Sequence, residues 1–150
     1  MIVKEFSLHL SLATIDDLPF ARELTRVNMR AYYVQYGLIW QPGAFDAEWP
    51  VRESYLICRE SCVIGFLGIT VEKNYLYVRD IQLIEAHRGE GVGAWAMTRI
   101  AQIAADRRCE RIRLKVFKSN PATALYRRLG YANVGEEAAL LWMERFVGDV

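Results

Sequence analysis

The sequence is poor in cysteine, and its apolar runs are short. Three cysteines in 150 residues are too few, and odd in number, for a disulfide scaffold. Cys58 and Cys62 stand close together, but no second pair or nearby histidine completes a set of four metal ligands. We therefore expect no metal site, and we interpret these two residues and Cys109 as free thiols of a reducing compartment.

The chain also lacks a segment with the pattern of a signal peptide or a membrane span. Its start, MIVKEFSLHL, carries charges where a signal peptide needs an unbroken apolar core. The longest apolar run, Val63–Val71, is interrupted by Gly65, Gly68 and Thr70, and it is far shorter than the roughly 20 residues of a spanning helix. The sequence predicts a soluble, cytoplasmic protein without a membrane partner.

An excess of charge of one sign is missing too. The net charge of +1 excludes the strongly basic footprint of a nucleic-acid-binding protein, and a hydrophobic content of 53% is typical of a folded domain. From Arg99 to Arg128, however, nine basic residues accompany only two acidic ones. This segment suits a polyphosphate ligand, although a solvated face explains each basic residue equally well. No linker or repeat divides the chain, so residues 1–150 are predicted to form one domain.

Apolar patterning predicts the elements of the first half of the chain. Apolar and polar residues alternate from Phe6 to Leu12, which predicts a strand. Thr14 can cap a helix whose first turn contains acidic residues and a proline, and we expect this helix to run to about Tyr33. Residues 37–53 are predicted to be irregular or partly helical, and strands are expected over residues 55–59, 63–71 and 75–84.

The second half adds a parallel connection. A helix is predicted over residues 91–108 because four residues form one apolar face at helical spacing: Val92, Ala96, Ile100 and Ile103. A strand over 111–117, a helix over 122–129 that ends at Gly130, and strands over 132–134 and 140–146 follow. The order β-α-βββ-α-β-α-ββ predicts an α/β (α+β) fold, in which a mixed, mostly antiparallel sheet has a central β-α-β unit and helices on both faces.

A glycine-rich turn, Arg88–Gly93, leads from a central strand into the long helix. A helix N-terminus presents N–H groups and a partial positive charge. Glycines at 89, 91 and 93 allow backbone amides to approach phosphate oxygens, and Arg88 adds a permanent cation with forked donors. The turn is a candidate phosphate-binding site, and a structural turn without a ligand is the alternative.

Two other nucleotide-binding motifs were compared with this turn. Gly89-x-Gly91-x-x-Ala94 matches the dinucleotide fingerprint, and Glu110 follows at about the expected interval. That fingerprint belongs to the first turn of a parallel sheet, whereas several strands joined by short turns precede this one, and Glu110 comes before its strand. The ATP-binding pattern G-x-x-x-x-G-K-[ST] is absent from the sequence. The context therefore argues against both motifs.

Two motifs together resemble those of the GCN5-related N-acetyltransferase (GNAT) superfamily. Its signature [Q/R]-x-x-G-x-[G/A], between a central strand and a helix, is matched by Arg88, Gly91 and Gly93. Downstream, the superfamily has an asparagine followed by L-Y-x-x-x-G-[F/Y], which corresponds here to Asn120 and Leu125–Tyr131. The order of the motifs and the strand between them carry the resemblance, which covers nearly the whole chain.

The resemblance implies a GNAT-like fold and an acetyl-CoA-dependent N-acetyltransferase, in which a bound primary amine attacks the acetyl group directly. Main-chain atoms of Leu83 and Ile84 would bind the pantetheine arm. Asn120 would contact acetyl-CoA, but the interval to Tyr126 is one residue shorter than usual, so Ser119 is the alternative. The pyrophosphate would be held by the turn, namely Arg88, Gly89, Glu90, Gly91, Val92, Gly93 and Ala94.

The resemblance also assigns an acid and leaves the base open. Tyr126 corresponds to the tyrosine proposed as general acid for the departing sulfur, since a phenol with a pKa of about 10 is protonated at neutral pH; packing in its helix is the alternative. Some relatives place a glutamate base at the position of Lys115; Lys115 does not match it, so that role cannot be transferred to this chain.

Asp80 is the best remaining carboxylate for the base, with Glu85 and Glu72 behind it. An ion pair of Asp80 with Arg79 or Arg113 is the competing interpretation. A water chain that ends at solvent is a further alternative.

The acceptor region of this superfamily is largely the first helix and the loop that follows it. Aromatic and acidic side chains there could bind a cationic amine, or they could cap the sheet or form a homodimer contact: Tyr32, Tyr33, Tyr36, Trp40, Phe45, Asp46, Glu48 and Trp49. Because no clear base is present, a module that binds or senses acyl-CoA without turnover is an alternative function. A dinucleotide-dependent oxidoreductase is a third.

Overall fold

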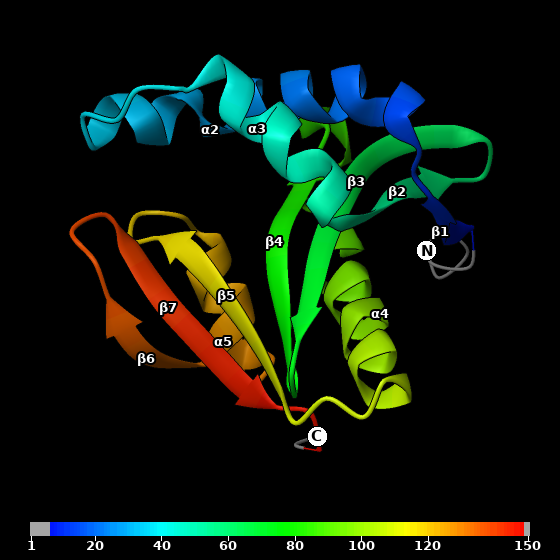
Figure 1. The fold of residues 1–150 in the computed structure, drawn as a ribbon, viewed down its shortest axis with the longest axis vertical. Helices are drawn as coiled ribbons and strands as arrows, with labels where there is room; N and C mark the ends of the chain where they lie inside the picture. Colours follow the sequence, from blue (N-terminus) through cyan, green and yellow to red (C-terminus); the bar gives the residue numbers. More distant parts are fainter. Residues whose placement is uncertain (1–6, 149–150) are drawn as a thin grey trace. The chain divides into compact units, whose positions relative to one another are not determined.

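A computed structural model describes residues 7–148, and Figure 1 shows its elements. The strands are β1 (Leu8–Leu12), β2 (Glu53–Arg59), β3 (Cys62–Glu72), β4 (Tyr75–Leu83), β5 (Arg111–Phe117), β6 (Ala132–Glu136) and β7 (Leu140–Phe146). The α-helices are α2 (Leu18–Gln35), α3 (Pro42–Glu48), α4 (Val92–Asp106) and α5 (Ala122–Arg128). Single 3₁₀ turns are formed by Ile15–Asp17, Trp49–Val51 and Glu85–His87. Phe6, in the predicted first strand, lies outside the described residues.

The strands form one seven-stranded sheet in the order β1-β2-β3-β4-β5-β7-β6. The pairs β1–β2, β2–β3, β5–β7 and β6–β7 are antiparallel, and β4–β5 is parallel. The predicted α/β (α+β) fold with one β-α-β unit, β4-α4-β5, is therefore confirmed. Residues 37–53, predicted as irregular or partly helical, contain α3 and a 3₁₀ turn.

The predicted cap at Thr14 forms, but it caps the 3₁₀ turn Ile15–Asp17 and not α2, whose own N-cap residue, Asp17, makes no side-chain cap within the described residues. Thr14 Oγ1 accepts a hydrogen bond from the amide of Asp16 at 3.2 Å, and the amide of Thr14 donates to Asp17 Oδ2 at 2.8 Å. This reciprocal capping box satisfies donors that have no partner inside the helix. The helix ends at Gln35, two residues later than expected.

The chain divides into two compact units. The first unit comprises residues 7–69 and 80–96, and the second comprises residues 70–79 and 97–148. Each unit is described by itself below.

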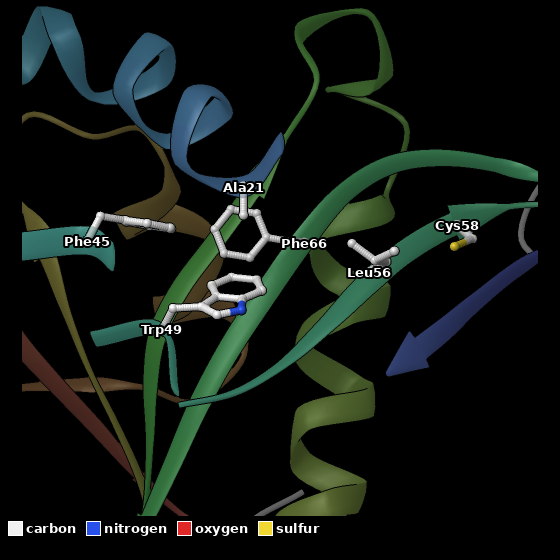
Figure 2. Packing of buried hydrophobic residues seen from close by; sticks show 6 residues of the cluster. All are labelled: Ala21, Phe45, Trp49, Leu56, Cys58 and Phe66. Carbon is white, nitrogen blue, oxygen red and sulfur yellow. The ribbon is translucent and has the colours of Figure 1, made fainter. Parts of the chain in front are cut away.

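The core of the first unit contains aromatic residues of α3 and the turn after it. Phe45 and Trp49 are buried, and the ring centroid of each lies 6.2 Å from that of Phe66 in β3. Ala21 of α2 and Leu56 of β2 belong to the same cluster, as Figure 2 shows. Burial of large aromatic side chains is the main stabilising contribution expected here.

In the second unit, β5 has one apolar and one charged face. Ile112, Leu114 and Val116 are buried. On the other face, Arg111 and Arg113 each bond to one oxygen of Glu144, at 2.6 and 2.7 Å. The paired charges explain how a carboxylate can be buried in the sheet.

The apolar face of α4 differs from the prediction at one residue. Val92, Ala96 and Ile100 are buried, but the next buried position is Ala104, and Ile103 is only half-buried. These buried residues of α4 thus follow one another at intervals of four, so the position after Ile100 on the apolar face is Ala104. At the end of α5, Gly130 has a φ of +94°, which confirms the predicted C-terminal glycine.

None of the helices within residues 7–148 is both long and apolar enough to cross a membrane.

The position of β4 in the first unit depends on a close approach at Gly65. A Cβ atom there would lie 2.3 Å from the carbonyl oxygen of Gln82 and 2.8 Å from Cδ2 of Leu83. The first of these contacts is to backbone, which cannot move aside like the end of a side chain. A side chain at position 65 would therefore push the end of β4 away from β3.

Replacement of Gly65 tests this contact. We expect Gly65→Ala to lower the free energy of unfolding by about 1–3 kcal/mol, the usual cost of overpacking. Gly68→Ala is the matched control on the same strand, because its Cβ would meet Ser54 Oγ and Arg52 Cδ at ordinary distances of 3.5 and 3.6 Å. Urea unfolding followed by circular dichroism measures both variants, and an equal loss in the two would contradict the proposed clash.

Candidate functional site

The glycine-rich turn has a backbone that requires glycine at two positions. Gly89 and Gly91 have φ values of +75° and +85°, in the left-handed region that other residues rarely adopt. A Cβ atom at either position would meet no other atom within 4 Å. Conformation, and not crowding inside the protein, thus selects glycine here, and the space beside both residues is open to a ligand.

The last two residues of the turn, Val92 and Gly93, already belong to α4. The first helical hydrogen bond in this turn runs from the amide of Trp95 to the carbonyl of Gly91 at 3.0 Å. Val92 is 1% exposed, so its side chain anchors the helix start in the core. A helix beginning in this way directs N–H groups and the positive end of its dipole toward the turn. The arrangement can bind an anion.

Arg88 is held beside the turn by an asparagine that the sequence did not single out. Its Nη2 atom donates to Oδ1 of Asn28 in α2 at 2.5 Å and contacts the carbonyl oxygen of Leu83 at 3.4 Å. Asn28 Nδ2 donates to the same carbonyl at 3.0 Å. The cation is therefore tied to the end of β4.

Glu90, which the sequence places in the turn, has its own cation. Arg59 Nη1 at the end of β2 donates to Glu90 Oε1 at 2.7 Å and lies 3.0 Å from Nδ1 of His87. The ion pair offsets a negative charge that would otherwise repel an anion at the helix start. Arg59 is a second residue of this region that no sequence motif identifies.

Two main-chain groups predicted to bind the pantetheine arm already have partners in the first unit. The carbonyl of Leu83 accepts from Asn28, and the amide of Ile84 donates to the carbonyl of Ile64 at 2.9 Å. The parallel pairing of β4 with β5 comprises Tyr75–Val78 and Arg111–Leu114, so it ends before the last residues of β4.

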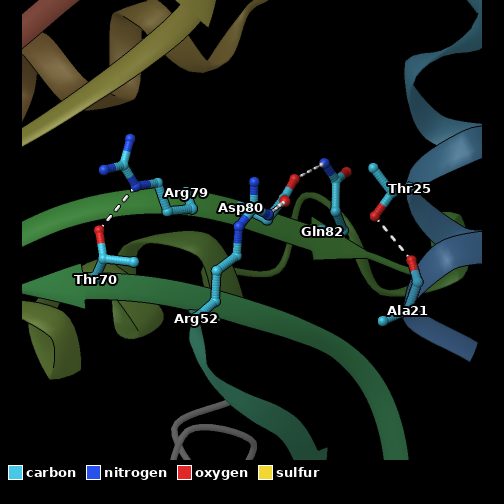
Figure 3. A network of polar contacts seen from close by, with 7 residues as sticks. All are labelled: Ala21, Thr25, Arg52, Thr70, Arg79, Asp80 and Gln82. Atoms are coloured by element: carbon cyan, nitrogen blue, oxygen red, sulfur yellow. Dashed lines mark hydrogen bonds and ion pairs between the residues drawn. The ribbon is translucent and has the colours of Figure 1, made fainter. Parts of the chain in front are cut away.

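Asp80 forms an ion pair, but with a different arginine from those expected. Its carboxylate bonds to Nη1 of Arg52 and accepts from Gln82 Nε2 at 3.2 Å (Figure 3). Arg79 instead contacts Thr70, and Arg113 bonds to Glu144, which corrects both predicted partners. No sequence pattern points to Arg52, because it lies 28 positions away in a loop.

Burial dominates the titration of this carboxyl group. The Asp80 side chain is 14% exposed, and removal from water raises its pKa, while the charge of Arg52 and the bonds from Arg52 and Gln82 act in the opposite direction. Burial also raises the pKa of the Tyr33 hydroxyl, with a smaller contribution from the negative charge of Asp80.

The predicted acceptor region separates into core and surface. Phe45 and Trp49 are core residues, so for them the sheet-capping interpretation is correct. Asp46 accepts two hydrogen bonds of 3.0 Å from Arg22. Other aromatic residues remain half-buried, among them Tyr33 and Trp40, whose ring centroids are 5.9 Å apart.

Asn120 and Tyr126 belong to the second unit. Asn120 Oδ1 accepts from the amide of Ala122 at 2.9 Å, so its side chain caps the start of α5. Tyr126 is 6% exposed and its ring lies edge-on to that of Tyr131 at 6.0 Å. Burial raises the pKa of Tyr126 to about 12. In the described part of the chain its hydroxyl forms no hydrogen bond with another residue.

The cysteines show no sign of a nucleophile. Cys58 and Cys109 are buried and Cys62 is exposed, all as free thiols. Burial raises the pKa of Cys58 and of Cys109, which disfavours the reactive thiolate. Between Ser7 and Gly148, no three His, Cys, Asp or Glu side chains are grouped as metal ligands.

Residues 21–131 match the acetyltransferase (GNAT) family. Streptothricin acetyltransferase of Streptomyces lavendulae is 38% identical over 103 residues, which are 67% of this chain and 54% of that protein. Thialysine N-epsilon-acetyltransferase of Sus scrofa is 32% identical over 82 residues, 51% of this chain and 48% of that protein. The chain thus spans about half the length of the curated relatives it matches.

The fold agrees with this match. The PaiA N-acetyltransferase of Thermoplasma acidophilum, solved in complex with coenzyme A, aligns with a TM-score of 0.74 over 93% of this chain and 99% of that one. Their sequences are 15% identical, so this likeness concerns the fold alone. The family match, in contrast, covers most of the present sequence and includes the glycine-rich turn. The chain belongs to the acetyltransferase (GNAT) family.

Proposed function

We propose that the chain is an acetyl-CoA-dependent N-acetyltransferase that transfers an acetyl group to a primary amine by direct attack. The observation that carries this proposal is the turn Arg88–Gly93, with two left-handed glycines at the start of α4, in a member of the acetyltransferase (GNAT) family. A cytoplasmic location, a single domain over residues 1–150 and a homodimer remain predictions from the sequence.

The turn fits the pyrophosphate of acetyl-CoA. Gly89 and Gly91 leave open space, the start of α4 supplies N–H groups, and Arg88 supplies charge. We assign the pyrophosphate to Arg88, Gly89, Glu90, Gly91, Val92, Gly93 and Ala94, with Glu90 acting through its backbone because its carboxylate pairs with Arg59. Leu83, Ile84 and Asn120 are the further proposed cofactor contacts. The Leu83 carbonyl, the Ile84 amide and the Asn120 side chain are each hydrogen-bonded within the protein, so the cofactor would use their other polar groups or replace these bonds. Acetyl-CoA supplies the activated thioester.

The burial of Tyr126 determines whether its hydroxyl can transfer its proton to the leaving sulfur or only donate a hydrogen bond to it. A phenol with a pKa of about 12 keeps its proton at every physiological pH. Passing that proton to a thiolate with a pKa of about 8.5 would be uphill by roughly 4–5 kcal/mol. We therefore assign Tyr126 a hydrogen bond to the leaving sulfur, without full proton transfer.

The role of base is assigned to Asp80. An alkylammonium with a pKa of about 10.4 must lose a proton before attack, which costs roughly 4–5 kcal/mol at pH 7. A buried carboxyl group with a raised pKa is a better proton acceptor than an exposed one. Asp80 also interacts electrostatically with Tyr33 of the acceptor region, since its negative charge helps to raise the pKa of the Tyr33 hydroxyl. The ion pair with Arg52 opposes this role, so a structural Asp80 with water as the proton acceptor is the competing mechanism.

The acceptor is proposed only as a class. The curated relatives named above are acetyltransferases of thialysine and streptothricin. The half-buried rings of Tyr33, in α2, and of Trp40, which follows α2 in the chain, suit an amine with an apolar body. Incubation with acetyl-CoA and a panel of amines, followed by mass spectrometry, tests the activity. Thermal stabilisation by acetyl-CoA without any acetylated product would instead indicate a binding or sensing module.

Gly91→Ala tests the turn. We expect the affinity for coenzyme A to fall at least about tenfold, because an alanine at a φ of +85° costs on the order of 1–3 kcal/mol and displaces the amides. Gly37→Ala is the matched control, since Gly37 also has a positive φ and open space but lies after α2. Titration calorimetry measures both, and equal affinities for the two variants would contradict the assignment.

Tyr126→Phe tests the hydrogen bond to sulfur. We expect kcat to fall about 10- to 100-fold, the value of a hydrogen bond to a developing charge, while the affinity for coenzyme A stays unchanged. Tyr131→Phe is the control, because the two rings form one aromatic pair. Steady-state kinetics measure kcat. An unaltered rate for Tyr126→Phe would leave this residue a packing role only.

Asp80→Asn tests the base. A base role predicts a kcat lower by about 100-fold and loss of the acidic limb of the pH–rate profile, because the wild-type carboxyl must be ionised to accept a proton. Stability should also fall, because Arg52 loses its counter-ion. Glu144→Gln, another buried, ion-paired carboxylate, controls for that loss. A kcat that falls no further than in the control would eliminate Asp80 as the base.

A further inference from the structure

The side-chain amide of Asn28 connects α2 to the end of β4 through two hydrogen bonds and to the glycine-rich turn through one. Its Oδ1 accepts from Arg88 Nη2 at 2.5 Å, and its Nδ2 donates to the carbonyl of Leu83 at 3.0 Å and to Gln82 Oε1 at 3.1 Å. The oxygen and one nitrogen of a single half-buried side chain are thus used on groups more than fifty positions away in the sequence.

Charged groups at both ends fix the orientation of this amide. Arg88 can only donate hydrogen bonds, so it requires the oxygen of Asn28. Asp80, at the other end, can only accept when ionised, so it requires the nitrogen of Gln82, at 3.2 Å, which turns Oε1 of Gln82 toward Asn28. The order Arg88–Asn28–Gln82–Asp80 therefore has one consistent direction, and a flipped amide would break it at both ends.

The guanidinium is held on one side and open on the other. Arg88 uses only Nη2 for Asn28 and Leu83. Within residues 7–148, its Nε and Nη1 atoms donate to no other residue, so three N–H bonds remain for an anion. An exposed arginine without such an anchor would sample many rotamers and would lose that freedom on binding a phosphate.

We infer that Asn28 is a positioning residue of the cofactor site: it holds the guanidinium of Arg88 at the end of β4, prepared for the phosphates at the glycine-rich turn. This inference rests on the proposed function and adds a residue of α2 to it. Asn28 acts through Arg88, so its contribution to cofactor affinity exists only when Arg88 is present.

A double-mutant cycle separates this role from a structural one. The variants are Asn28→Ala, Arg88→Ala and the pair, and the readouts are the dissociation constant of coenzyme A by calorimetry and the melting temperature. We expect Asn28→Ala to weaken binding about two- to tenfold, the cost of ordering one long side chain, and to have no further effect in the Arg88→Ala background. In steady-state kinetics, KM for acetyl-CoA should rise while kcat changes little.

Two further variants control for a folding defect and for a general effect of changing a polar residue of α2. Asn28→Leu keeps the branching and the number of side-chain heavy atoms, and leucine is a better helix former than asparagine. It should weaken binding as Asn28→Ala does, even where the smaller residue impairs folding. Arg26→Ala, on the same helix, removes only an exposed pair with Glu23 and should leave the affinity unchanged.

Equal losses of affinity from the Asn28 change in both backgrounds would overturn the inference and leave Asn28 a structural link between α2 and β4. Unchanged affinity in both Asn28 variants would also overturn it. Failure of the unmodified protein to bind coenzyme A would instead overturn the proposed function and the inference together, so the two failures are distinguishable.

Discussion

The close approach of β3 and β4 at Gly65 is the constraint on which the candidate site of the first unit depends. A backbone carbonyl occupies the space of a missing Cβ, and this fixes the end of β4 against its neighbour. The amide of Ile84 then bonds to β3, and the chain enters the turn that leads to α4. Because the two strands are so close, the backbone at Leu83 can move little, and this restricts the position at which the following turn begins.

Electrostatic balance around the turn follows from the same arrangement. Two carboxylates of the first unit that could oppose an anion are held by arginines, Glu90 by Arg59 and Asp80 by Arg52. The start of α4 and Arg88 then contribute positive potential at the turn. A helix N-terminus alone does not identify a ligand, whereas membership in the acetyltransferase (GNAT) family indicates which kind of ligand to expect at this turn.

Local patterns predicted most local features, with Ile103 on the face of α4 as an exception, and the larger errors concern contacts between distant segments. The capping box at Thr14, the strand Arg111–Phe117 and the terminal Gly130 needed only neighbouring residues. The predicted partners of Asp80, Arg79 and Arg113, are wrong, because its ion pair is with Arg52, 28 positions away. Asn28 and Arg59 could not be found, since one polar residue on a helix and one at a strand end have no distinctive spacing.

The sequence by itself determined the order of elements, the mixed sheet and the glycine-rich turn, because periodicity and backbone preference are properties of short segments. The matched motifs also determined the family. Only the tertiary structure decided which aromatic residues are core, how Asp80 is neutralised and what holds Arg88. The physical reason is that burial and ion pairing depend on residues that the fold brings together from far apart in the chain, and no local pattern records them.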